Sequence, residues 1–129
     1  MEFSLGKQER LKSKKLIEKL YKEGKSLKLF PFRMVYLQSN HTSNFPTQVG
    51  FSVPKRNFKN AVERNQIKRL LRESYRLQKS IIYNSVDKPY IFMISYLAKD
   101  ELKFVEIYPK MEKLLTLFIS ELKSKSNEN

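Results

Sequence analysis

The spacing of apolar and polar residues divides the chain into helical and extended segments. Apolar side chains first recur at helical spacing between Leu16 and Tyr21. Ser13 precedes this stretch as an N-cap residue and Gly24 follows it as a residue that commonly ends helices. These positions predict a short first helix.

The segment that follows, residues 26–54, is rich in aromatic and β-branched side chains, which favour strands. It contains two such runs, FPFRMVYLQS (30–39) and TQVGFSV (47–53), separated by the polar stretch NHTSNFP (40–46). A turn-rich connection of this length predicts an antiparallel pair or a meander.

A second helix is predicted from Asn60 onward, and it has two distinct sides. At about 100° per residue, one side holds Ile67, Leu70, Leu71, Ser74, Tyr75 and Gln78. The adjoining side holds Arg64, Lys68, Arg72, Arg76 and Lys79. We therefore expect one face of the helix to pack on the core and the next to present positive charge.

The last part of the chain adds one strand and one helix. YIFMISY (90–96) is apolar almost throughout and predicts a strand inside the sheet. Helical spacing then continues from Met111 to Leu122, with Pro109 expected in or just before the first turn and a loose tail from Lys123. Helix, strands, helix, strand and helix in this order predict an α+β sandwich in one domain covering residues 1–129.

Positive charge is concentrated in two segments. Residues 54–79 hold nine Lys or Arg against two Glu, and residues 1–30 hold nine against four, so these segments carry +12 of the net +13. A solvated helix face normally pairs bases with Glu at i, i+4, but only Glu63 and Glu73 interrupt the nine bases. The clustering favours a polyanionic partner over a merely solvated face and predicts salt-dependent binding.

Other classes of protein find little support. The chain has no cysteine, no Gly-rich phosphate loop and no metal-ligand spacing. Its one histidine, His41, lies in a loop segment, and Asp100, Glu101 and Glu106 are more simply explained as a helix entry than as metal ligands. Without an apolar signal segment or membrane span, we expect a cytoplasmic protein with no catalytic or metal-binding side chain of its own.

Exposed aromatic side chains would offer a second binding surface. Tyr21, Phe30, Phe32 and Tyr36 can each stack on an unpaired base or pack in the core. Since alternate strand residues face opposite sides of a sheet, Tyr36 cannot share a face with Val35. The pattern leaves open which of the two faces is exposed.

One family has a similar order of motifs. The run AVERNQIKRLLRE (61–73) resembles the basic motif of the protein subunit of bacterial ribonuclease P, and the lead-in VGFSVPKRNFKNAV (49–62) resembles that family's strand and loop. The opening RLKSKKLIEKLYKEGKS (10–26) is similar as well. The resemblance covers most of the chain, and its C-terminal third rests on the order of elements.

The resemblance implies a fold and a function. The fold would be a ribosomal-protein-like sandwich of three helices and a four-stranded, mainly antiparallel sheet, with a left-handed βαβ crossover carrying the basic helix. The function would be that of an accessory subunit of an endoribonuclease, which binds the catalytic RNA and the 5′ leader of precursor tRNA while the leader is removed. Mg²⁺ would act at the RNA subunit, and the protein would bind that RNA 1:1 without an obligate protein oligomer.

The resemblance also implies two sets of site residues. RNA binding would fall on Arg64, Asn65, Gln66, Lys68, Arg69, Arg72 and Arg76, together with Lys55, Arg56 and Lys59 of the lead-in. Gln66 stands where the family usually has Arg, so one charge-assisted contact is replaced by an amide. The leader-binding cleft would be formed by Ile17, Tyr21, Tyr36 and Ser52, with Ile17 in place of a frequent Phe.

Two other interpretations stay open from the sequence. A ribosome-associated or general RNA-binding protein of the same fold would have no preference for a 5′ leader. A DNA-binding module that inserts residues 60–79 in the major groove would need side chains aimed at base edges, and Asn65 is the one such amide well within the basic stripe.

Overall fold

The computed structural model describes residues 5–41 and 45–126. Its elements in chain order are η1 (Lys7–Glu9), α1 (Lys14–Glu23), β1 (Lys25–Leu29), β2 (Phe32–Gln38), β3 (Thr47–Ser52), α2 (Ala61–Arg76), α3 (Ser80–Tyr83), β4 (Tyr90–Tyr96) and α4 (Phe104–Ser126). The α+β class with one four-stranded sheet is confirmed. To the three expected helices the structure adds the short α3 and the single-turn η1.

The first two helices begin where side-chain caps predict. The Ser13 hydroxyl accepts a hydrogen bond from the Leu16 N–H at 3.3 Å, and the Asn60 side-chain oxygen accepts one from the Val62 N–H at 2.8 Å. Gly24 does end α1, although for a steric reason rather than for a left-handed backbone. A Cβ at this position would meet the Leu20 carbonyl oxygen at 2.4 Å, which leaves no room for a side chain.

The sheet is mixed, with strand order β1-β2-β4-β3. β1 pairs with β2 and β2 with β4 in antiparallel fashion, whereas β3 pairs with β4 in parallel. The expected antiparallel pairing of the two runs in residues 30–53 is therefore wrong, because β4 inserts between β2 and β3. β4 is apolar along nearly its whole length, so a central position that covers both of its faces is favourable.

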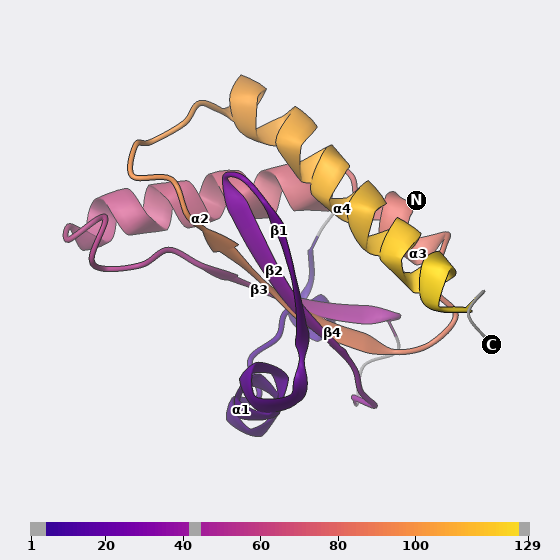
Figure 1. The fold of residues 1–129 in the computed structure, drawn as a ribbon. Coiled ribbons are helices and arrows are strands. Elements are labelled where there is room, and N and C mark those ends of the chain that lie inside the picture. Colours follow the sequence, from indigo (N-terminus) through magenta and orange to yellow (C-terminus); the bar gives the residue numbers. More distant parts are fainter. Residues whose placement is uncertain (1–4, 42–44, 127–129) are drawn as a thin grey trace.

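Helices cover the two faces of the sheet unequally (Figure 1). α1 lies alone on one face, where Leu20 packs with Val35, Ile91 and Met93. α2 and α4 lie on the other face and enclose the larger core with Phe32, Tyr75, Phe92 and Phe118 among its buried side chains. α2 and α3 form the crossover between β3 and the parallel strand β4, and the hand of that crossover stays a prediction.

The last helix is longer at both ends than expected. α4 begins at Phe104, where the Glu106 carboxylate accepts a hydrogen bond from the Lys103 N–H at 2.8 Å and so caps the first turn. Pro109 consequently lies inside the helix rather than at its start, with its ring on the exposed side. The helix continues through Ser126, past the expected start of the tail at Lys123, and residues 127–129 lie outside the described ranges.

Candidate nucleic-acid interface

α2 presents positive charge because its apolar side packs in the core and its other sides carry the basic residues. Ile67, Leu71 and Tyr75 are at most 1% exposed. Arg69 on the outer surface is exposed, and the adjoining Lys68 is half-buried. Packing against the sheet and α4 thus fixes which side of the helix faces outward, as the periodicity predicted for Lys68 and Arg72. The prediction is wrong for Lys79, which lies beyond the end of α2, is 3% exposed and forms an ion pair with Glu9.

A hollow beside α2 brings half of the predicted RNA-binding bases together. It is lined by Leu5, Arg10, Asn65, Lys68, Arg69, Arg72, Glu73 and Arg76. Five of these side chains are bases and one is an acid, and Glu73 forms an ion pair with Arg76 at 2.6 Å. We call these eight residues the basic hollow. Its excess of positive charge suits a phosphate backbone.

The other predicted RNA-binding residues lie outside the basic hollow. Arg64 donates hydrogen bonds from Nη1 to the carbonyl oxygens of Phe58 and Lys59, at 2.8 and 2.9 Å. It therefore holds the loop before α2 in place. Lys55, Arg56 and Lys59 are exposed in that lead-in, and Gln66 is exposed on the helix.

The predicted leader-binding cleft is only partly assembled by the structure. Ile17 and the exposed Tyr21 lie on α1, and Ser52 lies on the sheet face that α1 partly covers. Tyr36 does not belong to this cleft. Its ring is on the opposite face, 4% exposed, with its centroid 5.0 Å from that of Phe118. Burial there raises the pKa of the Tyr36 hydroxyl, and the charge of Glu121 adds to the rise.

Strand pleating explains why Tyr36 was assigned wrongly. Side chains alternate between faces, so an offset of one residue places a side chain on the wrong side of a sheet. Val35, which pairs with Met93, is the residue that faces α1 at this point of β2. The sequence indicated that Val35 and Tyr36 face opposite ways but not which of them faces α1.

The register also shows which other residues belong to the α1 face. Arg33 is paired with Ser95, which is paired with Ser52, and Lys28 lies opposite Arg33 on the edge strand. Directly paired residues share a face, so these polar and basic side chains form one row beside Ser52. Lys28 and Arg33 are exposed. Finding this row requires the strand order, which local patterns do not contain.

Arg10 is the residue of the basic hollow that sequence reasoning missed. It is one of nine bases in residues 1–30, and no local signal separates it from the others. Its place follows from the N-terminal segment, which runs beside β3 with a parallel bridge between Arg10 and Val49.

Within residues 5–41 and 45–126, no three His, Cys, Asp or Glu side chains gather into a group that could hold a metal ion. None of the helices in these ranges combines the length and the apolar character needed to cross a bilayer.

A mixed four-stranded sheet with one helix on one face and a strongly basic helix on the other is typical of a small α+β nucleic-acid-binding protein. Residues 5–118 match the family model for ribonuclease P. The chain belongs to the ribonuclease P protein family.

Known proteins of this family resemble the chain over most of its length. It is 34% identical over 131 residues to the ribonuclease P protein component of Porphyromonas gingivalis, covering 98% of this chain and 95% of that one. The corresponding protein of Syntrophus aciditrophicus is 32% identical over 113 residues, with 88% and 89% of the two chains covered.

Solved structures show the same fold. The RNase P protein of Staphylococcus aureus superposes with a TM-score of 0.66 at 27% identity, covering 84% of this chain and 94% of that one. The RNase P protein of Thermotoga maritima superposes with a TM-score of 0.67 at 24% identity, covering 83% and 94%, and supports the fold alone.

Proposed function

We propose that this chain is the protein subunit of a bacterial ribonuclease P, and that it promotes removal of the 5′ leader from precursor tRNA by binding RNA through the basic hollow. Membership of the family supports the role in tRNA 5′-end processing. The assignment of the binding surface rests on one observation, which is that Arg10 and four bases of α2 line the same hollow.

The basic hollow acts by reducing repulsion between two polyanions. Precursor tRNA and the catalytic RNA repel each other through their phosphates, and like charges about 4 Å apart cost roughly 1 kcal/mol in water and about 4 kcal/mol near a protein surface. A positively charged wedge between them lowers this cost and releases counterions. The protein therefore strengthens substrate binding without supplying a catalytic side chain.

Chemistry at the scissile phosphodiester bond belongs, in this proposal, to the RNA subunit and its Mg²⁺ ions. The protein contributes by holding the substrate in position, which is worth most when the metal concentration is low. We further propose a 1:1 complex with the RNA, no obligate protein oligomer and a cytoplasmic location.

The 5′ leader would lie along the sheet face next to α1. Tyr21 is 54% exposed and offers a ring for stacking on an unpaired base. Ser52, Arg33 and Lys28 offer a hydroxyl and two cations in the row described above. Only a precursor carries a leader to occupy this surface, so its occupation would distinguish precursor from mature tRNA.

Cleavage of a precursor tRNA by a bacterial ribonuclease P RNA at low Mg²⁺, with and without the chain, tests the proposal. The wild type should stimulate cleavage. Lys68→Ala and Arg72→Ala should each weaken the stimulation and reduce the slope of log affinity against log salt by roughly 1.

The exposed base Lys110 on α4 provides a matched control, because it does not line the basic hollow. Lys110→Ala should stimulate cleavage like the wild type. Tight RNA binding without stimulation would instead support a general RNA-binding protein. Equal binding to duplex DNA would support the DNA-binding alternative.

A further inference from the structure

We propose that Glu9 is a positioning residue: its buried ion pair with Lys79 fixes residues 5–11, the N-terminal strap, in the register that places Arg10 in the basic hollow, where Arg10 contacts an RNA phosphate. The inference rests on the proposed RNA-binding function. It adds a binding residue outside α2 and the buried contact that keeps it there.

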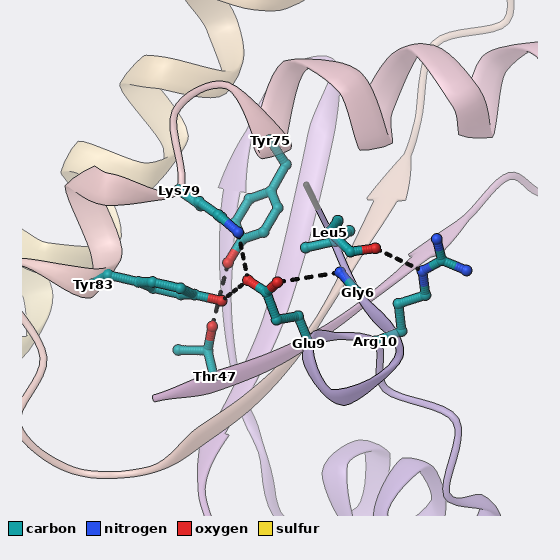
Figure 2. A network of polar contacts seen from close by, with 8 residues as sticks. All are labelled: Leu5, Gly6, Glu9, Arg10, Thr47, Tyr75, Lys79 and Tyr83. Atoms are coloured by element: carbon teal, nitrogen blue, oxygen red, sulfur yellow. Dashed lines mark hydrogen bonds and ion pairs between the residues drawn. The ribbon is translucent and has the colours of Figure 1, made fainter. Parts of the chain in front are cut away.

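The carboxylate of Glu9 is satisfied from three directions (Figure 2). Its Oε2 accepts hydrogen bonds from Lys79 Nζ at 2.7 Å and from the Tyr83 hydroxyl. Its Oε1 accepts one from the Gly6 N–H at 3.1 Å. The Glu9 and Lys79 side chains are each 3% exposed, so this is a buried pair and not a surface one.

Aromatic side chains surround the pair. Lys79 Nζ lies 5.4 Å from the centre of the Tyr83 ring, and the Tyr75 hydroxyl is 3.2 Å from Thr47 Oγ1 (Figure 2). Burial raises the pKa of the Tyr83 hydroxyl, and the charge of neighbouring groups adds to the rise, so Tyr83 stays protonated and able to donate. A charge on one partner without the other would be strongly disfavoured here.

The other hydrogen bonds of the strap select one register less strictly. Leu11 N–H donates to the Val49 carbonyl at 2.9 Å, and Gln48 Nε2 donates to the Gln8 carbonyl at 3.1 Å. Hydrogen bonds to backbone groups can form equally well one residue further along the chain. A slip of one residue would turn Glu9 away from Lys79 and leave a buried charge unpaired. The ion pair therefore adds to the burial of Leu5 and Leu11 in selecting a single register.

That register determines where Arg10 lies. Glu9 ends η1 and Arg10 follows it on extended backbone, and Figure 2 shows the two side chains leaving the strap in different directions. Arg10 Nε donates to the Leu5 carbonyl at 3.2 Å, and its side chain lines the basic hollow. Glu9 therefore acts on the hollow through its neighbour in the chain.

Electrostatics explain why a firm anchor is needed. Arg10 approaches Lys68, Arg69, Arg72 and Arg76, with Glu73 the one acid lining the hollow. In the absence of RNA these charges repel Arg10, and a loosely held strap would move it away. Burial of Leu5 and Leu11 together with the ion pair keeps it in place. The conformational entropy of Arg10 is then lost when the protein folds, so ordering Arg10 does not weaken RNA binding.

A double-mutant cycle tests the inference, with ribonuclease P RNA as the probe and the full chain in every variant. Arg10→Ala should weaken binding roughly tenfold, as expected for one charge-assisted contact, and should lower the salt slope by about 1. Glu9→Gln should produce the same loss and the same change of slope. The double variant Glu9→Gln/Arg10→Ala should bind no more weakly than either single variant.

The sign of the Glu9→Gln effect separates positioning from bulk charge. Removing an acid from a protein that binds a polyanion should strengthen binding, as expected for the control Glu63→Gln on the exposed face of α2. Weaker binding by Glu9→Gln therefore supports positioning. Binding that is unchanged or tighter, or losses that add up in the double variant, would overturn the inference.

Folding is monitored by circular dichroism for each variant. If Glu9→Gln does not fold, Glu9→Gln/Lys79→Met replaces it, because this variant removes both buried charges and leaves the net charge unchanged. The same loss of affinity and slope is expected from it. If Lys68→Ala weakens RNA binding but Arg10→Ala does not, the inference fails and the proposed function stands. If neither weakens it, both fail.

Discussion

At the scale of single residues, Tyr21 and Tyr36 show how burial decides what an aromatic side chain does. Tyr21 is 54% exposed on α1, whereas Tyr36 is 4% exposed and packs edge-on against Phe118. Their residue type is the same and both lie in amphipathic segments. One is available to a partner, and the other is a core residue.

Substituting each tyrosine with alanine should separate these roles. Tyr21→Ala should leave the free energy of unfolding nearly unchanged and reduce the preference for precursor over mature tRNA by roughly tenfold, the value of one stacked base. Tyr36→Ala should lower the free energy of unfolding by about 3–5 kcal/mol through the cavity it leaves. Chemical denaturation and competitive tRNA binding measure the two effects. A Tyr21→Ala variant with full precursor preference would exclude this face as the leader site.

At the scale of elements, the contact between the N-terminal strap and the start of α3 is a buried ionic junction. Burial alone would raise the pKa of the Glu9 carboxyl. Hydrogen bonds from Lys79, Tyr83 and the Gly6 N–H, together with the charge of Lys79, outweigh burial and bring the pKa below its ordinary value of 4.5. The junction is therefore formed by the ionised carboxylate, and its contribution depends on pH.

The lowered pKa of Glu9 predicts a loss of stability in acid. The unfolded chain binds a proton at Glu9 at higher pH than the folded chain does, so the contribution of Glu9 is complete above its ordinary pKa of 4.5 and is lost as pH falls through the folded-state pKa. Denaturant unfolding of wild type and Glu9→Gln between about pH 7 and pH 3 measures this contribution as a difference. A difference that stays constant across that range would contradict the prediction.

At the scale of the whole molecule, a net charge of +13 on 129 residues opposes the compact state through self-repulsion. A net charge of +4 is gathered where α2 and the strap meet, because the basic hollow holds five bases and one acid. The folded protein should therefore be stabilised by anions that occupy this surface before RNA does.

Sulfate or phosphate should raise the melting temperature more than chloride does at equal ionic strength. The extra rise should shrink in Arg10→Ala and Lys68→Ala, which remove bases from the basic hollow, and persist in Lys110→Ala. Thermal unfolding followed by circular dichroism provides the measurement. A melting temperature that sulfate and phosphate leave unchanged would show that repulsion in this surface does not limit stability.

The sequence by itself determined the features that depend on neighbouring residues. Capping chemistry predicts that helices start at Ser13 and Asn60. Periodicity predicts the basic stripe beside the apolar stripe of α2 and the interior position of β4. Motif order also led to the correct family. These signals depend on residues only a few positions apart, so they can be recognised in the sequence alone.

Only the tertiary structure decided the features that join distant parts of the chain. The insertion of β4 between β2 and β3 brought Arg33 into line with Ser52. Packing of α4 on one face of the sheet placed Tyr36 in the core against Phe118. Glu9 and Lys79 are 70 residues apart in sequence, yet their contact places Arg10 in the basic hollow. Local periodicity shows that a strand or a charge needs a partner, but the packing of the whole chain determines which residues form that partner.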